Sequence, residues 1–436
     1  MHPRGSRTLR AQLTIATLAP GGDGVAHAEI GGERRAVFVP HASPGDVLSA
    51  EIDASQRPAR GRILELLAAG PDRASPACPW STRCGGCNWM HLSLEAQVRA
   101  HVEHVRAALP DKWRAMAIAT HPAPAATGYR TRARVHVRCK RGQVAVGMNE
   151  SRTHDPVNVD VCAVLDAPLE RARRSLAGIF EGSRGHGDVT IALGPLGTDR
   201  PPVLDVQWTG DLADACFARL EQAVAGRAIA GARATIEGAS RPAVIGDPTP
   251  WVIGADGLPL RLPPGGFAQA SERTSAMLAH WVAEIVRPYH AERAVELYAG
   301  AGNLSVLLAR EVTALVLVES SRDACDAARA NLAGRANNAH VVEADAEVYA
   351  WNAATKLVVL DPPRTGARAV AERLVPSRVS HVVYVSCDAQ TLGRDLKILA
   401  QAYDARSVAT FEMFPQTSHV EVVLALERRR AGGAQR

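Results

Sequence analysis

The chain has 436 residues, of which 47% are apolar and 22% charged, and this suits a soluble protein with two or three separately packed domains. No apolar run approaches the roughly 18 residues that span a bilayer, and no apolar segment follows the charged first residues as in a signal peptide. Composition therefore argues against a membrane or secreted protein, and we expect a cytoplasmic monomer.

The net charge of +5 comes with an uneven choice of basic residue. Only four of the 50 basic residues are lysines, namely Lys112, Lys140, Lys356 and Lys397. Arginine makes bidentate contacts with phosphate and stacks on bases, so an RNA partner would suit this composition. A GC-rich genome that favours arginine codons explains it equally well, and charge alone leaves the partner open.

Residues 8–68 contain five short β-like runs separated by turns rich in glycine and proline. Strands of this number and spacing predict a small closed barrel of the OB kind, which commonly binds nucleic acid through one sheet face and its loops. A barrel with a purely structural role is the alternative. The predicted strands are 9–17, 24–30, 35–39, 46–53 and 61–67.

Three of the eight cysteines fall within ten residues, in the pattern Cys78-x5-Cys84-Gly-Gly-Cys87. In a cytoplasmic chain such a group more often holds a metal than forms disulfides. Zinc ligands usually come in C-x2-C pairs, and only one such pair is present here. A fourth thiolate distant in sequence therefore favours a [4Fe–4S] cluster, and Cys139 is one candidate by its position.

The region from residue 93 to residue 268 predicts a helix at 93–109 and then a mixed α/β domain whose topology the pattern leaves open. The expected strands are 130–138, 143–148, 188–193, 203–208 and 233–236, with helices near 166–180 and 211–224.

A helix at 270–287 opens a regular alternation of strands and helices that runs to the end of the chain. Alternation of this kind predicts a parallel sheet with helices on both faces. The predicted strands are 293–298, 314–319, 339–343, 356–361, 380–386, 405–411 and 420–427.

A glycine turn, Gly300-Ala-Gly302-Asn303, follows the first of these strands and opens a helix. Glycines let the backbone pass close to a ligand, and the missing third glycine of the dinucleotide fingerprint means that a pyrophosphate is not implied. Glu319 ends the next strand, where it can accept hydrogen bonds from two ribose hydroxyls, and Asp345 can accept one from an adenine amino group. The alternative interpretation is that Glu319 is only an exposed residue at the end of a strand, without a ligand. Together these features favour S-adenosylmethionine as cofactor.

Asp361-Pro-Pro-Arg364 ends the fourth strand, at the carboxyl edge where open α/β sheets bind ligands. Methyltransferases that act on exocyclic amines usually place an aromatic residue after the two prolines, where it stacks on the amine-bearing base. Arg364 in that place argues against methylation of an amine.

Cys387 ends the following strand, and is therefore expected on the same edge as Asp361. A thiolate that adds to carbon 6 of a pyrimidine makes an enolate, whose carbon 5 can then take a methyl group. The carbon-5 proton must leave to a base, which Glu421 can supply. Because a free thiol is mostly protonated at neutral pH, a nearby cation, Arg364 or Arg394, would help. The alternative interpretation of Cys387 is a small apolar residue buried in the core. The alternative for Glu421 is an ordinary carboxylate at the edge of a strand, without a catalytic role.

Four segments closely resemble those of the RNA uracil-5-methyltransferases, and the resemblance covers about residues 8–427. They are Gly300-Ala-Gly-Asn303, Asp361-Pro-Pro-Arg364, Val385-Ser-Cys-Asp-Ala-Gln-Thr-Leu-Gly-Arg-Asp395 and Phe414-Pro-Gln-Thr-Ser-His-Val-Glu421. The resemblance implies that Cys387 is the nucleophile and Glu421 the base. Phe267-Ala-Gln269 looks like the family's segment that contacts cofactor and target base. The implied cofactor-binding and active-site contacts are Gln269, Tyr298, Gly300, Gly302, Asn303, Glu319, Asp345 and Asp361.

The branch of this family that acts on ribosomal RNA also implies Cys162 as the fourth ligand of the cluster. The family's Cys-Gly-Gly-Cys is usually followed by a Gln-His pair, and this chain departs from it with Met90-His91. The departure removes the amide and whatever it does in the family, and it leaves the three metal-binding thiols in place.

The resemblance implies a multidomain α/β architecture: an OB-like barrel of the TRAM type at 1–70, a mixed α/β RNA-binding domain with the iron–sulfur site at 71–269, and a class I, Rossmann-like methyltransferase domain at 270–436. We expect 23S ribosomal RNA as substrate, with transfer RNA as the alternative. An RNA cytosine-5-methyltransferase is a rival, although that family carries a second cysteine beside its Asp-Pro motif. A non-catalytic RNA-binding iron–sulfur protein is the rival of another class.

Overall fold

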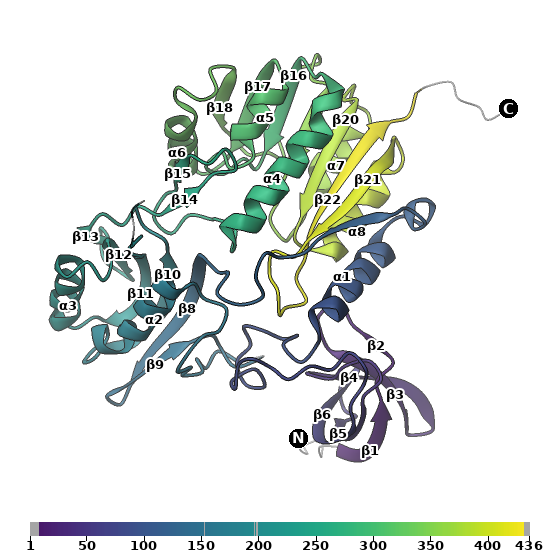
Figure 1. Cartoon of the computed structure of the whole chain (residues 1–436), viewed down its shortest axis with the longest axis vertical. Coiled ribbons are helices and arrows are strands. Elements are labelled where there is room, and N and C mark those ends of the chain that lie inside the picture. The colour runs from purple at the N-terminus through teal and green to yellow at the C-terminus, as the bar shows by residue number, and fades with distance from the viewer. Residues whose placement is uncertain (1–7, 152, 196, 198, 431–436) are drawn as a thin grey trace. The chain divides into compact units, whose positions relative to one another are not determined.

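The computed structural model describes residues 8–151, 153–195, 197 and 199–430, and the chain divides into two compact units. Unit 1 comprises residues 1–104, 149–157 and 414–418, and unit 2 comprises residues 105–148, 158–413 and 419–436. Figure 1 labels the elements in chain order. In the described part of the chain, no helix is long and apolar enough to cross a membrane. The domain boundaries at 70 and 269 stay predictions.

Unit 1 contains a six-stranded sheet in the order β1-β5-β6-β4-β3-β2. The first strand is interrupted after Thr14, and it pairs with β5 through β1 and with β3 through β2, so the sheet curls round on itself. Leu13, Val37, Leu48 and Ile52 are among the side chains buried inside it. All five predicted strands are present, the first in two pieces. Their bounds are β1 Thr8–Thr14, β2 Thr17–Leu18, β3 Gly24–Ile30, β4 Glu33–Val39, β5 Val47–Asp53 and β6 Ala59–Ala68.

Residues 69–93 form turns, bends and isolated bridges without a helix or strand. Ser93 caps the next helix, α1 (Leu94–Ala108), because its Oγ accepts a hydrogen bond of 3.2 Å from the Ala96 N–H. A short segment from far along the chain completes unit 1, since the Gln416 N–H donates to the Gln97 side chain at 2.8 Å.

The first sheet of unit 2 is mixed and has the order β13-β12-β11-β10-β8-β9. Alternate residues of β8, among them Val135 and Val137, pack with Leu169 and Leu176 of α2 and Leu220 of α3, so one sheet face is covered by helices. The bounds are β8 Arg132–Lys140, β9 Gln143–Gly147, α2 Ala167–Ile179, β10 Arg184–Ala192, β11 Val203–Asp211, α3 Asp214–Ala225, β12 Gly231–Ile236 and β13 Ala243–Gly246. A separate ribbon, β14 (Trp251–Ile253) and β15 (Pro259–Arg261), follows.

The second sheet of unit 2 has eight strands in the order β18-β17-β16-β19-β20-β22-β21-β7. The first five are parallel, and β22 lies antiparallel between β20 and β21. The helices predicted at 93–109 and 270–287 and all seven predicted strands are confirmed with shifted ends. The bounds are β16 Arg293–Leu297, β17 Ala314–Glu319, β18 Ala339–Glu343, β19 Leu357–Leu360, β20 His381–Ser386, β21 Tyr403–Phe411 and β22 Glu421–Arg428.

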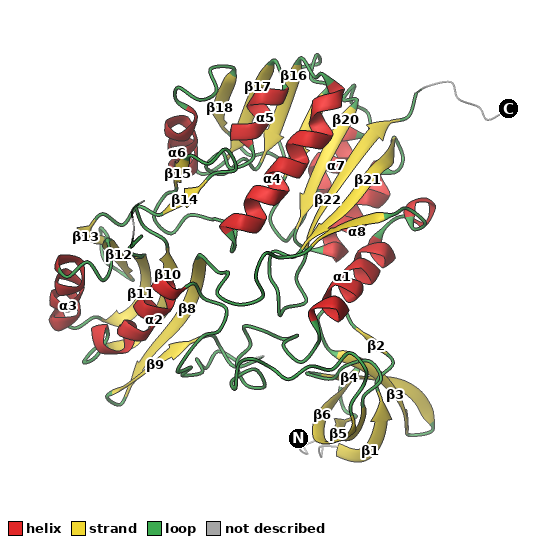
Figure 2. Cartoon of the chain, viewed as in Figure 1, coloured by secondary structure: helices red, strands yellow, loops and turns green. Residues whose placement is uncertain are grey.

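Helices cover both faces of this sheet, as Figure 2 shows with α4 in front of the strands and α7 and α8 behind them. One core joins α4, α5 and α6 to one face, and the other joins α7, α8 and the end of α1 to the opposite face. The bounds are α4 Glu272–Val286, α5 Ser305–Glu311, α6 Arg322–Leu332, α7 Arg368–Leu374 and α8 Ala389–Leu399, with short 3-10 turns η1 Asp111–Trp113 and η2 Arg287–Tyr289.

The strand at the β21 edge of this sheet, β7 (Ile118–His121), was not predicted from the sequence. It comes from a stretch of chain before the other sheet of unit 2, and it pairs in parallel with β21. The His121 ring stacks on the Phe411 ring with centroids 4.3 Å apart. The eight-stranded sheet therefore takes one edge strand from outside the predicted range 270–436.

Candidate active site

Three strand ends meet at one edge of the eight-stranded sheet. Asp361 follows β19 and Cys387 follows the parallel strand β20, so both lie at the carboxyl ends of their strands. Because β22 is antiparallel and Val422 pairs with Ser386, the same register brings Glu421 opposite Cys387. Glu421 is only 2% exposed, and Cys387 is half-buried. The structure thus brings together the nucleophile and the base that the sequence predicts.

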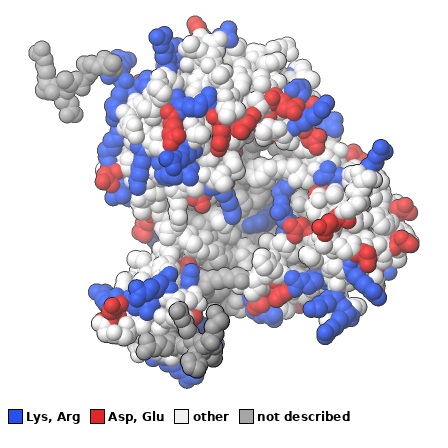
Figure 3. All heavy atoms as spheres, turned by 180° about the vertical axis from the view of Figure 1, so that it is seen from behind, with Lys and Arg blue, Asp and Glu red and all other residues white. Residues whose placement is uncertain are grey.

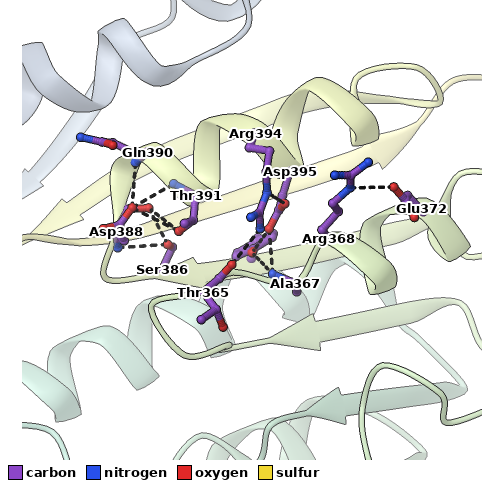
Figure 4. Close-up of polar contacts among 11 residues, drawn as sticks. Thr365, Ala367, Arg368, Glu372, Ser386, Asp388, Gln390, Thr391, Arg394 and Asp395 are labelled. Carbon is purple, nitrogen blue, oxygen red and sulfur yellow. Dashed lines mark hydrogen bonds and ion pairs between the residues drawn. The ribbon is translucent and has the colours of Figure 1, made fainter.

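The backbone around Cys387 is fixed by the residues on either side of it. The carboxylate of Asp388 caps α8 by accepting hydrogen bonds from the N–H groups of Gln390 (3.0 Å) and Thr391 (2.9 Å). The Ser386 hydroxyl donates to the Asp388 carbonyl at 3.1 Å, as Figure 4 shows. The Ser-Cys-Asp sequence therefore places the thiol just before a helix N-terminus, which favours a thiolate.

Arg394 pairs with the buried Asp395 rather than with the thiol. It makes an ion pair of 2.8 Å with Asp395 and donates to the Thr365 carbonyl, also at 2.8 Å (Figure 4). Asp395 is fully buried and also accepts hydrogen bonds from the Tyr384 hydroxyl and the Ala367 N–H. A Cβ on nearby Gly366 would lie 2.6 Å from the Asp395 and Arg394 side chains, so only glycine fits there. This network holds the loop after Asp361-Pro-Pro.

Arg364 is the cation that acts on Cys387. Burial raises the pKa of the Cys387 thiol to about 12, and the carboxylates of Glu421 and Asp361 raise it as well, while Arg364 lowers it. The same guanidinium lies 3.3 Å from His419 Nε2. Of the two arginines that the sequence left open, the structure favours Arg364.

Glu421 and Asp361 are two carboxyl groups at the same edge of the sheet, and the charge of Asp361 acts on Glu421. Burial raises the pKa of both carboxyl groups, and the charge of Asp361 raises the pKa of Glu421 further, whereas Arg364 lowers it. Oε2 of Glu421 is buried without a hydrogen-bond partner. A carboxylate with a vacant lone pair and an elevated pKa is suited to accept a proton from a substrate near neutral pH.

Replacing Arg364 by glutamine is expected to shift the acid limb of the reaction rate to higher pH, by up to about one unit. A base must be ionised to act, so the rate is present above the pKa of Glu421 and lost as the pH falls through it. Removing the cation raises that pKa, and the loss then begins at higher pH. Single-turnover rates across the neutral range measure the shift. Arg368→Gln is the control, because Arg368 pairs with Glu372 on the surface (Figure 4); an unmoved limb in R364Q would contradict the assignment.

The cofactor edge is formed by the ends of β16 and β17. The Glu319 carboxylate accepts hydrogen bonds from the N–H groups of Gly300 (3.0 Å) and Ser321 (2.8 Å), which fix its position. Gly300 and Gly302 have φ angles of 55° and 89°, which glycine adopts without strain. Glu319 is thus held by the glycine turn itself, with lone pairs left for ribose hydroxyls.

Two further predicted residues carry polar atoms that are buried without a partner, Gln269 Oε1 and the Tyr298 hydroxyl. Tyr298 also has a left-handed φ of 61°, and burial raises its pKa to about 12. Buried polar atoms without partners and strained backbone often mark ligand sites. Phe267, two residues before Gln269 in the chain, is 74% exposed, and an exposed aromatic ring suits stacking on a base.

Asn303 and Asp345, the remaining predicted contacts, are engaged locally. The Asn303 amide donates to Ser275 at 3.0 Å, and the Asp345 carboxylate accepts from the Glu347 N–H at 2.8 Å. Asp345 follows β18 and Asn303 precedes α5, so both belong to the loops at the same sheet edge.

Glu296, on β16 and four residues before Gly300, was not predicted as a site residue from the sequence. It is 2% exposed and accepts a hydrogen bond of 2.6 Å from the Ser305 hydroxyl. Burial raises the pKa of Glu296 to about 8. A carboxyl among apolar strand residues was the available signal, and its contact with Ser305 ties the strand to the start of α5 beneath the turn.

The predicted metal ligands lie in different units. Cys78, Cys84 and Cys87 belong to unit 1, while Cys162 belongs to unit 2, where burial raises its pKa. Cys139 is a buried core residue of β8 whose thiol donates to the Phe180 carbonyl. Within residues 8–151, 153–195, 197 and 199–430, no three His, Cys, Asp or Glu side chains are grouped so that they could hold a metal ion.

The parallel sheet with one antiparallel strand inserted near its end, and the glycine turn after its first strand, define a class I methyltransferase fold. The crystal structure of Pyrococcus abyssi tRNA (uracil-54, C5)-methyltransferase in complex with S-adenosyl-L-homocysteine shares the fold, with a TM-score of 0.72, 20% identity, and coverage of 95% of this chain and 100% of that one.

Sequence comparisons narrow the class further. The family described as tRNA (Uracil-5-)-methyltransferase matches residues 258–356 and 345–429. The 23S rRNA (uracil(1939)-C(5))-methyltransferase RlmD of Halomonas elongata is 33% identical over 461 residues, which cover 98% of this chain and 92% of that protein. The protein of the same name from Pseudomonas putida is 31% identical, over 96% of this chain and 94% of its own. The chain belongs to the RNA uracil-5-methyltransferase family.

Proposed function

We propose that the protein transfers a methyl group from S-adenosylmethionine to carbon 5 of uracil in RNA, and that the RNA is 23S ribosomal RNA. The observation that carries the proposal is the placement of Cys387 opposite Glu421 at the sheet edge that also bears Asp361 and Glu319. The curated relatives that match over nearly the full chain support ribosomal RNA as the substrate.

The side chains at this edge account for each proton in the reaction. The Cys387 sulfur bonds to carbon 6 while the thiol proton passes to Asp361, so that Glu421 stays ionised for the later step, and the ring becomes an enolate. S-adenosylmethionine supplies the electrophilic methyl group that carbon 5 captures. Glu421 then takes the carbon-5 proton, and elimination breaks the sulfur–carbon bond and restores the thiolate. The target base must leave its stack to reach the half-buried Cys387.

One surface of unit 2 supports RNA as the substrate. On β8 the residues that alternate with the buried ones are basic, namely Arg132, Arg134, His136, Arg138 and Lys140. They occupy the sheet face opposite α2 and α3, where Asp188 of β10 pairs with Arg134 and His136. A row of basic side chains at strand spacing suits a phosphate backbone. Basic and acidic side chains are interspersed on the face of the molecule that Figure 3 shows.

Tritium release tests the proposal most directly. Incubation with S-adenosylmethionine and a 23S rRNA transcript labelled with tritium at carbon 5 of uracil should release tritium to water. No release from any RNA would favour a non-catalytic RNA-binding protein, and release only from cytosine-labelled RNA would favour a cytosine-5-methyltransferase. Mass spectrometry of ribosomal and transfer RNA from a deletion strain would identify which RNA loses 5-methyluridine.

We also propose that Cys78, Cys84 and Cys87 bind a [4Fe–4S] cluster, with Cys162 as the predicted fourth ligand. Three thiols in an irregular segment suit such a cluster, since the metal can replace regular secondary structure as the source of order. No step of the methyl transfer passes through it. The curled six-stranded sheet of unit 1 supports its assignment as a TRAM-type barrel.

Protein purified without oxygen should show broad absorption near about 400 nm from sulfur-to-iron charge transfer. The Cys87→Ser variant should lack this absorption band and nearly all of the bound iron, because one thiolate ligand of the cluster is gone. Cys216→Ser, a change inside the core between α3 and the central sheet, is the matched control. A colourless wild-type protein containing zinc would refute the cluster assignment.

A further inference from the structure

Unit 1 contains a cavity of about 910 Å³ that the methyl-transfer chemistry does not use. It lies between β5 and β6 of the curled sheet and the irregular segment 76–91. Its lining includes His41, Arg62, Arg73, Arg83, Met90 and His91. The volume is in the range of pockets that take small molecules or single nucleotides.

His91 is the feature that points to a ligand. It is 3% exposed, yet neither ring nitrogen has a partner with hydrogen-bond geometry, although the Ala42 backbone lies near enough to favour the protonated ring slightly. Burial, with help from the charges of Arg73 and His41, lowers the pKa of His91 to about 4. The ring is therefore neutral at physiological pH, and carries one donor and one acceptor that a bound group can satisfy.

The wall beside His91 is rigid. Arg73 makes an ion pair of 2.5 Å with the fully buried Asp46 and donates to the His41 carbonyl at 2.8 Å. His41 has a left-handed φ of 59°, and its ring meets that of His91 edge-on, with centroids 5.9 Å apart. A strained residue held in place by a buried ion pair indicates a preformed site rather than loose packing.

The chemistry of the lining selects the ligand. A free anion is poorly matched, because His91 is neutral and the charges of Arg73 and Arg62 are already balanced by Asp46 and Glu51. A base edge is well matched, since a neutral imidazole pairs with its donors and acceptors. Arg83, whose guanidinium lies 5.9 Å over the Trp80 ring, offers a flat surface on which a base can stack.

We propose that this cavity binds one unpaired nucleotide of the RNA substrate, with the edge of its base on His91 and its ring against Arg83. The proposal rests on RNA methylation as the proposed function. It assigns to unit 1 a site that recognises a base, in addition to the site at Cys387 that methylates one.

The test compares His91→Phe with His91→Gln in the full chain, using a fluorescently labelled, unmodified 23S rRNA transcript at fixed salt. Phenylalanine fills the space but cannot hydrogen-bond, so it should weaken binding by about tenfold or more, whereas glutamine, which keeps a donor and an acceptor, should largely retain it. The Tm of H91F should not fall, because His91 has no hydrogen bond to lose. His104→Phe is the matched control: it loses a 3.0 Å hydrogen bond to the Leu18 carbonyl, so Tm should fall while RNA binding is kept.

Unchanged binding in H91F would overturn the proposal, as would equal losses in H91F and H91Q or a loss of bound iron in both. Tritium release by the wild-type protein on the same transcript separates the test of the cavity from the test of the proposed function. If release occurs and H91F binds normally, the cavity assignment fails and the proposed function stands. If the wild type releases nothing from RNA that it binds, the proposed function fails first.

Discussion

Replacement of Cys387 by alanine should reduce methyl transfer by at least about 10³-fold, because no other group can form the bond to carbon 6 that makes carbon 5 nucleophilic. Binding of S-adenosylmethionine should persist, since Glu319 and the glycine turn, which we propose as its binding site, are untouched. Isothermal titration measures the binding, and tritium release measures the turnover.

Cys216→Ala provides the matched control for this experiment. Cys216 is fully buried in the core between α3 and the central sheet, far along the chain from the catalytic edge, so its loss affects packing rather than chemistry. Its turnover should match that of the wild type. Substantial turnover by C387A would refute the assignment of the nucleophile.

Replacement of Glu421 by glutamine should stop the reaction after methyl transfer and leave the enzyme covalently bound to RNA. Glutamine keeps the shape but cannot take the carbon-5 proton, so multiple turnover should fall by about 10² to 10⁴-fold. The carboxylate of Glu421 raises the pKa of the Cys387 thiol, so its removal should also ease formation of the first bond. A band of retarded mobility on a denaturing gel, sensitive to ribonuclease, measures the adduct.

Glu427→Gln is the control on the same strand. Glu427 pairs with Arg406 at 2.7 Å near the far end of β22 and takes no part in the site. It should turn over normally without an adduct. Clean turnover by E421Q would remove Glu421 as the base.

Much of the site could be predicted because strand ends are visible in the sequence. Apolar runs closed by Glu319, Asp361 and Cys387 indicate three strands, and parallel strands bring their carboxyl ends to one edge. The strand that brings Glu421 opposite Cys387 was harder to predict, since chain order alone would place β21 beside β20. The structure instead inserts β22 there, and the reason is burial: six consecutive residues of β22 are buried, while the first half of β21 is partly exposed.

Other features depended on contacts that spacing cannot encode. No pattern in the sequence distinguishes Arg394, which pairs with Asp395, from Arg364, whose charge lowers the pKa of the Cys387 thiol. The lack of partners around His91 is visible only in three dimensions. The pairing of β7 with β21 joins residues as far apart as Ala119 and Thr410, and a four-residue strand carries little pattern of its own.

That pairing has a consequence for how the protein is made. The ribosome releases β7 long before β21, whose paired residues lie 290 positions later (Val408 pairs with Ile118), so the edge of the sheet is completed only near the end of translation. A truncated chain that began at Ala270 would present the bare outer backbone of β21 to its neighbours. Such an exposed border recruits strands from other copies, and we expect that fragment to aggregate where the full-length chain does not.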